Sequence, residues 1–272
     1  MMSCDKLKEP YIIESIVVKG DTIPLTADDT INFDGKVVVL LEDYTGVKCT
    51  NCPAAAAITL QLQEQNEGHL VVLGVHPNNP GNSSVQNPLG GFPDFRTDDG
   101  KIWNDYFNIS HYPQGLVNRM GNPLEASQWT TAVTDIIGAD APIRLIVKTD
   151  FDNATRELNV TIHSKFLRDV ESTDITLITC IMEDNIIGKQ ITPTGTVDDY
   201  VHRHVFRGTA DGKEWGQKMN DEENFILAGT NIIKTMKFTL NDEYNANEVY
   251  IVAFITDNTT KEVLMAAETK IK

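Results

Sequence analysis

Two cysteines, Cys49 and Cys52, are the residues in this sequence whose type and spacing most directly predict chemistry. They follow a turn at Thr45-Gly46 and come directly before Pro53. A thiol at the start of a helix faces unpaired backbone N–H groups and the positive end of the helix dipole, and both favour the thiolate. We therefore expect Cys49 to have a lowered pKa and to be the exposed, attacking sulfur, while Cys52 resolves the mixed disulfide.

The segments around the cysteines are those that would position such a pair. Residues 37–41 form a short, β-branched apolar run that is typical of a strand buried on both faces. Residues 54–65 are rich in alanine and contain no helix breaker, and a proline is tolerated in the first turn of a helix. The order of strand, turn, Cys-x-x-Cys and helix predicts redox chemistry. The competing interpretation is a structural disulfide or two unreactive thiols.

The chain up to residue 140 is predicted to form one α/β domain. Further strands are expected at 11–18, 70–75 and 115–118, and further helices within 92–107 and at 125–137. A strand–helix–strand crossover is right-handed, so its strands are parallel and their carboxyl ends share one edge of the sheet. Cys49 and His76 both follow strand ends at that edge. Tyr112-Pro113 comes before the last strand, and an aromatic residue before proline favours a cis peptide bond.

The pattern changes after residues 139–142. Alternating and β-branched runs then recur with turn residues between them, and no segment has a helical period. The expected strands are 143–149, 157–166, 175–183, 201–206, 232–240, 249–256 and 262–270. This predicts an all-β, antiparallel, immunoglobulin-like sandwich. The predicted organisation is a flexible tether at 1–10, an α/β domain at 11–140 and a β-sandwich at 141–272.

Charge and cysteine usage restrict the partners and the location. The formal net charge of −16 argues against nucleic acid and against an anionic membrane surface as partners. Four cysteines in 272 residues are too few for a disulfide scaffold. Cys180 lies within an apolar run and is expected to be buried and inert. Cys4 fits the lipidated residue of a bacterial lipoprotein, so membrane contact would come only through a lipid anchor; the alternative is a free thiol in a disordered start.

The first predicted domain resembles the thioredoxin superfamily. Cys49-Thr50-Asn51-Cys52 stands where that superfamily has its redox pair, and Tyr112-Pro113 where it has its cis-proline. Lys48 replaces the usual tryptophan before the first cysteine. The resemblance implies a thioredoxin-like fold in which Tyr112 and Pro113 position an extended substrate strand.

The resemblance also gives an acid a role. Asp43 lies six residues before Cys49, the spacing of a buried acid that serves some thioredoxins as a proton acceptor. Asp43 would relay a proton to or from Cys52. Glu42 is the competitor for this role, and a solvated acid at a strand end is the simpler alternative.

A second resemblance covers nearly the whole chain. The segment 41–46, the Cys-x-x-Cys-Pro motif, the segment 112–119 and His202-Arg-His204-Val together look like the 28-kDa outer-membrane protein family. That resemblance implies a lipoprotein of the bacterial cell envelope, on the periplasmic or surface side of the outer membrane. It implies location and fold more than a reaction.

Three functions remain open on these observations. The first is a thiol-disulfide oxidoreductase without cofactor or metal, acting on a cysteine-containing protein or peptide. The second is a surface binding or assembly module whose cysteine pair is structural. The third is a Cu or Zn metallochaperone that uses Cys49, Cys52 and either His76 or His111. Three further histidines, His163, His202 and His204, could form a second metal site or simply line a half-buried sheet.

Overall fold

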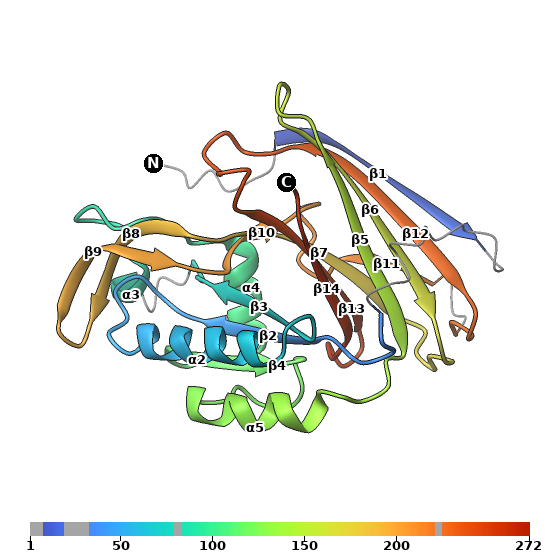
Figure 1. Ribbon diagram of the computed structural model, residues 1–272, viewed down its shortest axis with the longest axis horizontal. Coiled ribbons are helices and arrows are strands. Elements are labelled where there is room, and N and C mark those ends of the chain that lie inside the picture. The colour runs from blue at the N-terminus through green and yellow to red at the C-terminus, as the bar shows by residue number, and fades with distance from the viewer. Residues whose placement is uncertain (1–7, 19–32, 79–82, 221–224) are drawn as a thin grey trace.

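The computed structural model describes residues 8–18, 33–78, 83–220 and 225–272 (Figure 1). The helices among these residues are α2 (Cys52–Gln65), α3 (Ser83–Gln86), α4 (Asp98–Tyr106) and α5 (Ala126–Ile136). The strands before residue 140 are β1 (Lys8–Val18), β2 (Val39–Tyr44), β3 (Leu70–Val75) and β4 (Gln114–Val117). The strands after it are β5 (Ile143–Phe151), β6 (Glu157–Phe166), β7 (Ile175–Glu183), β8 (Ile186–Thr192), β9 (Gly195–His202), β10 (Val205–Thr209), β11 (Gln217–Lys218), β12 (Asn231–Thr239), β13 (Val249–Asp257) and β14 (Val263–Lys270). The described chain is mostly β, with mixed and antiparallel sheets.

The central sheet has eight strands and contains both parallel and antiparallel pairs. Its order is β14-β13-β7-β10-β3-β2-β4, and β11 pairs with β7 off this path. β2 and β3 are parallel, every residue of both strands is buried, and β4 lies antiparallel on the other edge of β2. Strands from both sides of residue 140 belong to this sheet, because β10 inserts beside β3. The boundary at 140/141 stays a prediction.

The alternation of side chains along the strands separates the two larger hydrophobic clusters, one on each face of the central sheet, and Val47, Phe95 and Val205 form a third, small cluster. Val39 and Leu41 of β2 belong to the cluster that contains Trp129 of α5. Leu40 and Tyr44 belong to the cluster that contains Trp103 of α4. Neighbouring residues of a strand point to opposite faces. Glu42 and Asp43 are therefore expected on different sides of the sheet.

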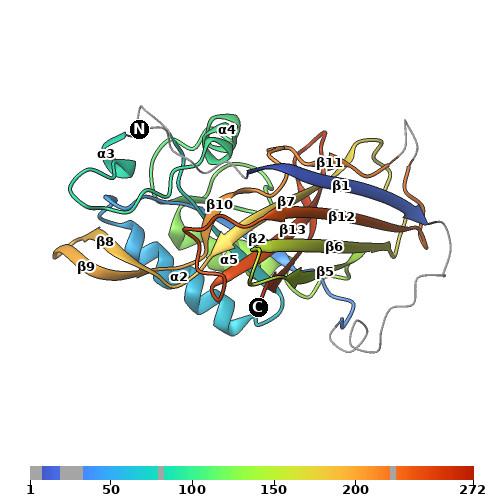
Figure 2. The same ribbon diagram turned by 90° about the horizontal axis from the view of Figure 1, so that it is seen from above.

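A four-stranded antiparallel sheet covers the cluster that contains Trp129, on the side of the molecule opposite β8 and β9 (Figure 2). Its order is β1-β12-β6-β5. Together with the antiparallel strands β7, β13 and β14 it gives the sandwich-like packing that we predicted for the second half. β1 pairs with β12 rather than with the α/β strands, and it begins at Lys8, inside the segment predicted as a tether. Residues 1–7 lie outside the described residues.

A two-stranded sheet of β8 and β9 was not predicted, and it projects away from the four-stranded sheet (Figures 1 and 2). We expected no strand between 183 and 201 and one strand at 201–206. Instead, the antiparallel pairing of β7 with β10 continues into that of β8 with β9, from Glu183–Val205 to Ile186–His202, and the chain reverses between Thr192 and Gly195. Asn185 has a φ of 55° and separates β7 from β8. His204 has a φ of 54° and separates β9 from β10. Backbone of this kind is favoured by asparagine and tolerated by histidine. It interrupts both arms of one long hairpin, which the apolar pattern of the sequence did not indicate.

Candidate functional site

The cysteine pair forms a disulfide at the carboxyl ends of the parallel strands β2 and β3. The Sγ atoms of Cys49 and Cys52 are 2.05 Å apart, and Cys52 is the first residue of α2 with Pro53 in its first turn. The alanines after Pro53 make α2 a strong helix former. The sequence therefore placed the pair correctly at a helix N-terminus.

The expectation of an exposed Cys49 is wrong. Cys49 is only 6% exposed and Cys52 only 2%. The physical reason is the unpredicted β8–β9 hairpin: Gln190 Nε2 donates to the carbonyl oxygens of Gly46 at 3.3 Å and Cys49 at 3.1 Å. The backbone N–H of Ile191 also donates to the carbonyl oxygen of Val47 at 3.0 Å, an ordinary length for a backbone hydrogen bond. The loop that carries Cys49 is thus held by the hairpin.

The Tyr112–Pro113 peptide bond is cis, as predicted, and lies beside the disulfide. The carbonyl oxygen of Tyr112 is 3.6 Å from Cys49 Sγ. The phenol of Tyr112 donates to Asn104 Oδ1 at 2.8 Å, which fixes the side chain away from that carbonyl. The role of Tyr112 and Pro113 in positioning a substrate strand stays a prediction.

The two candidate acids are separated by the sheet. Glu42 is fully buried and accepts two hydrogen bonds from Arg119, at 2.9 and 2.7 Å, on the α4 side. Asp43 is 4% exposed, and its Oδ1 has no hydrogen-bond partner within the described part of the chain. Burial raises the pKa of Asp43 to about 8. Glu42 is therefore paired with Arg119, whereas Asp43 keeps an unpartnered oxygen among the described residues.

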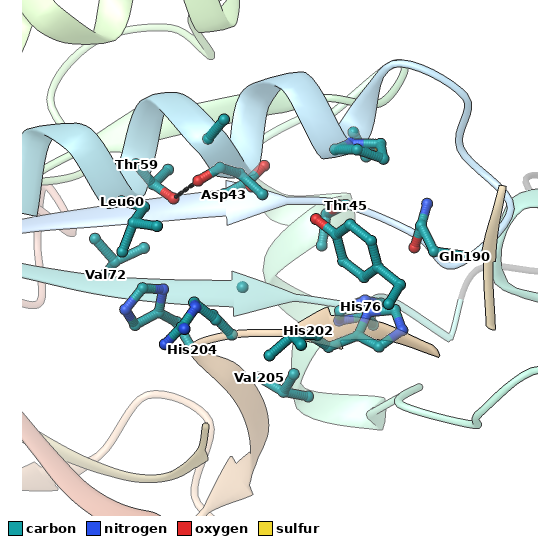
Figure 3. A pocket seen from close by; sticks show the side chains of 18 residues that line it. Asp43, Thr45, Thr59, Leu60, Val72, His76, Gln190, His202, His204 and Val205 are labelled. Carbon is teal, nitrogen blue, oxygen red and sulfur yellow. Dashed lines mark hydrogen bonds between the residues drawn. The ribbon is translucent and has the colours of Figure 1, made fainter. Parts of the chain in front are cut away.

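Asp43 and Cys52 line one pocket of about 340 Å³ (Figure 3). Helix α2 forms one wall, β2 and β3 contribute its base, and the segment 200–205 forms the opposite wall. Figure 3 shows Asp43 beneath α2 near Thr59, whereas His76 and His202 lie together across the pocket. The pocket is lined by the second sulfur, a buried acid and three histidines, of which His76 and His202 are 126 residues apart in the chain and His204 follows two residues later.

The histidines do not gather into the metal sites that we considered. His111 lies outside the pocket, and its Nε2 is 3.0 Å from Glu125. His204 points to Gln63, with Nε2 2.8 Å from Oε1, and His163 lies in β6 of the other sheet. Among the described residues no group of three or more His, Cys, Asp or Glu side chains is placed to hold a metal ion.

The residues that sequence reasoning missed come from the hairpin. Gln190, Tyr200 and His202 belong to β8 and β9, and all three line the pocket beside Cys52. The motif His202-Arg-His204 stands out in the sequence, but its place in the same pocket as His76 follows from the fold. Of the other cysteines, Cys180 is fully buried, as predicted, and burial raises the pKa of its thiol. The predicted lipidation site, Cys4, lies outside the described residues.

Comparison with solved structures shows similar folds at low identity. HBP35 of Porphyromonas gingivalis is 20% identical, with a TM-score of 0.64 over 87% of this chain and 76% of that chain. Protein AGR_C_4864 from Agrobacterium tumefaciens is 11% identical, with a TM-score of 0.51 over 87% of this chain and 96% of that chain. At these identities the likeness concerns the fold alone. A search of curated proteins gave no match.

The family comparison covers most of the chain. A domain of the outer membrane lipoprotein Omp28 from Porphyromonas gingivalis aligns with 48% of this chain at 18% identity and a TM-score of 0.32. None of the described helices has the length and apolar character needed to cross a membrane. The family model described as outer membrane protein Omp28 matches residues 101–272, which include Tyr112, Gln190 and His202. Since this match extends over well more than half of the chain, the chain belongs to the Omp28 outer-membrane protein family and is a protein of the bacterial cell envelope.

Proposed function

We propose that this chain is a lipid-anchored thiol-disulfide oxidoreductase with a thioredoxin-like first half, acting on cysteine-containing proteins or peptides. One observation carries the proposal: Asp43, a buried acid with an unpartnered oxygen, lines the same pocket as Cys52. A carboxyl group that is protonated at neutral pH can supply the proton that a leaving thiolate needs. The parallel β2–β3 pair, the start of α2 at Cys52 and the Tyr112 carbonyl beside Cys49 support the thioredoxin-like assignment.

Exchange from the oxidised state begins when a substrate thiolate attacks Cys49 Sγ. The Cys49–Cys52 bond breaks, a mixed disulfide forms, and the Cys52 sulfur takes the proton of Asp43. A second substrate thiolate then attacks the substrate sulfur and releases Cys49 as a thiolate. The substrate loses two electrons as its disulfide forms, and the cysteine pair gains them. In the reverse direction the Asp43 carboxylate takes the proton from Cys52, and a substrate disulfide is reduced.

Access to Cys49 is part of this proposal, because the sulfur is 6% exposed. The Gln190 contacts to the carbonyls of Gly46 and Cys49 must loosen before a protein substrate reaches the sulfur. The hairpin forms a sheet of only two strands, and such peripheral units open at lower free energy than the core. The substrate strand would then lie along Tyr112 and Pro113.

The pH profile of thiol-disulfide exchange tests the role of Asp43. The expected result is that Asp43→Asn slows exchange and removes a titration near pH 8 from the rate profile, with Cys49→Ser and Cys52→Ser as inactive references. An unchanged profile in Asp43→Asn would show that this acid does not transfer the proton. Exchange that survives in Cys49→Ser would refute the assignment of the attacked sulfur.

We also propose that the lipid anchor is attached to Cys4. Membership in an outer-membrane family supports an anchor for a chain whose net charge of −16 opposes binding to an anionic lipid surface. The expected result is a lipid-modified N-terminal peptide in the mass spectrum of the membrane fraction. Cys4→Ser should release the protein into the soluble fraction, and membrane retention of that variant would contradict the proposal.

A second candidate function is a surface binding or assembly module in which the disulfide is structural. The burial of both sulfurs favours it, since structural disulfides are protected from thiols whereas exchanging ones are accessible. This alternative predicts that Cys49→Ser changes only stability. Loss of exchange without loss of folding in Cys49→Ser would exclude it as the main function.

A further inference from the structure

Strand β9 forms the open edge of the two-stranded sheet. The free side of β8 is already used, because the N–H of Ile191 donates to the carbonyl oxygen of Val47 at 3.0 Å. For β9, the only strand partner within the described ranges is β8. Of the residues of β9, only His202 is buried. An open strand edge presents backbone N–H and C=O groups that can pair with a further chain.

The same strand leads into the pocket beside Cys52. Tyr200 and Val201, near the end of β9, contribute to one wall of this pocket, and both are at least partly exposed. The opposite wall belongs to α2 (Figure 3). It consists of apolar residues at helical spacing that are partly or fully exposed: Pro53, Ala56, Ala57 and Leu60. Accessible apolar surface therefore lies on both sides of the pocket, at the end of an open strand edge.

The size of the pocket suits one large side chain. Its volume is about 340 Å³, and a cavity of roughly 150 Å³ accepts benzene, so the side chain of leucine or phenylalanine fits. Recognition by strand addition combines main-chain hydrogen bonds along an edge with pockets for particular side chains. The edge of β9 and the pocket at its end provide both parts of this arrangement.

The charges on β9 select among polypeptide partners. Asp198 and Asp199 are both exposed, and among the described residues Lys189 lies 3.6 Å from Asp198. Two copies of this chain that paired through β9 would bring these carboxylates together, and like charges across a strand pair are destabilising. A segment with lysine or arginine would place opposite charges there. A basic segment of another protein therefore fits this edge better than a second copy does.

We propose that β9 binds an extended basic segment of a partner protein by strand addition, with one bulky apolar side chain of that segment in the pocket between α2 and Tyr200. The segment would lie next to the disulfide, because Cys52 lines the same pocket. The inference does not rest on the exchange reaction. It identifies the chemistry of the partner for an oxidoreductase and for a binding module alike.

The test uses a fluorescein-labelled peptide in which lysine alternates with valine and a single central phenylalanine, and the full-length oxidised protein. The peptide contains no cysteine, and binding is measured by fluorescence anisotropy. We expect a dissociation constant on the order of 100 μM or tighter, and binding at least about tenfold weaker when serine replaces the phenylalanine. A peptide with glutamate in place of lysine should bind more weakly than the parent. Equal affinity of the phenylalanine and serine peptides would overturn the proposal, because a chain of net charge −16 attracts any basic peptide.

Backbone methylation tests the strand pairing itself. N-methyl groups on alternate residues remove the N–H donors along one edge of the peptide and leave its charges and side chains in place. Of the two alternating patterns, one should weaken binding about tenfold or more, while the other leaves it close to that of the parent. If both patterns bind as well as the parent, the peptide does not add to the edge of β9 and the proposal is wrong.

Matched variants locate the bound peptide. Ala57 is exposed and lines the pocket, so Ala57→Phe should obstruct it and weaken binding about tenfold or more. Ala54 is exposed on the same helix and does not line the pocket, so Ala54→Phe should leave binding unchanged. Asp199→Lys should weaken binding, whereas Asp135→Lys, an equal change of charge on α5, should have little effect. If Ala57→Phe binds the peptide as well as Ala54→Phe does, the apolar side chain is not in the pocket and the inference fails.

The remaining outcomes separate this inference from other occupants and from the redox proposal. A concentration-dependent dimer in sedimentation experiments that the peptide dissociates would make a second copy the occupant and would overturn the assignment of the partner. Binding by the Cys49→Ser/Cys52→Ser double variant would support the site even if exchange activity is absent. Conversely, an active oxidoreductase that does not bind the peptide would keep the proposed function and lose this inference.

Discussion

Replacing Asp43 by asparagine should change how the stability of the protein depends on pH. The wild-type carboxyl is 4% exposed, and burial raises its pKa from 3.8 to about 8. The folded state therefore binds a proton that the unfolded state has already released between these two pH values. The stability associated with Asp43 is fully present below about pH 4 and is lost as the pH rises toward about 8. Asparagine has nearly the same shape as the protonated acid and no proton to lose.

The size of the effect follows from the shift in pKa. One pKa unit corresponds to about 1.4 kcal/mol, so between about pH 5 and pH 8 the wild type should lose up to about 4 kcal/mol relative to Asp43→Asn. His76 and His202 act in the opposite direction, because their lowered pKa values give stability that is lost as the pH falls below about 6.5. Both histidines are present in the two proteins, so their contribution largely cancels in the difference.

The assay is urea unfolding of the oxidised wild type and of Asp43→Asn at several pH values between about 5 and 8. Asp135, exposed on α5, provides Asp135→Asn as the control for the replacement itself. The reasoning predicts a difference in unfolding free energy between wild type and Asp43→Asn that grows steadily with pH. A difference that stays constant over this range would refute the protonated, buried state of Asp43.

Three further predictions concern the groups that hold the site. Gln190→Ala should accelerate reduction of the disulfide by a small thiol about fivefold or more, because hydrogen bonds worth roughly 1 kcal/mol each are lost from the Cys49 loop. Lys189→Ala, on the same strand, should leave the rate unchanged. Equal rates for the two variants in stopped-flow measurements would show that the Gln190 hydrogen bonds do not restrict access to the disulfide. Glu42→Gln should lower the free energy of unfolding in urea by about 3–5 kcal/mol, because it leaves the buried Arg119 charge unpaired, and the double change Glu42→Leu/Arg119→Met should recover much of this. Gly115→Ala should cost about 1–3 kcal/mol in thermal unfolding, because its Cβ would be 2.8 Å from the carbonyl of Glu42, and an unchanged Tm would contradict that close contact.

The strand–helix part of the site could be predicted because its information is local. The apolar run of β2, the two-residue spacing of the cysteines and the alanine-rich α2 are contiguous in the sequence. β3 was predicted at its observed bounds, Leu70–Val75, since a short buried strand between turn residues has a clear pattern. For Asp43 the sequence left a buried acid and a solvated acid both open, and the structure shows the side chain buried.

The cover over the cysteines could not be predicted, because it depends on pairing between distant segments. Gln190 contacts the carbonyl of Cys49 across 141 residues, and nothing in the local pattern of β8 indicates this partner. His202 reaches His76 only because β10 inserts beside β3, where Gly74 lets the backbone of His204 approach closely. The exposure of Cys49 was therefore misjudged although its position at the helix start was correct.

The reduction potential of the Cys49–Cys52 pair, measured by equilibration with glutathione, tests the proposed exchange most directly. The account predicts a value in the range of exchanging pairs, roughly −270 to −120 mV. A thiolate released at the N-terminus of α2 and a proton supplied by Asp43 both favour the reduced form and raise the potential. A potential well below about −300 mV would mean a structural disulfide and would contradict the oxidoreductase in favour of the binding module.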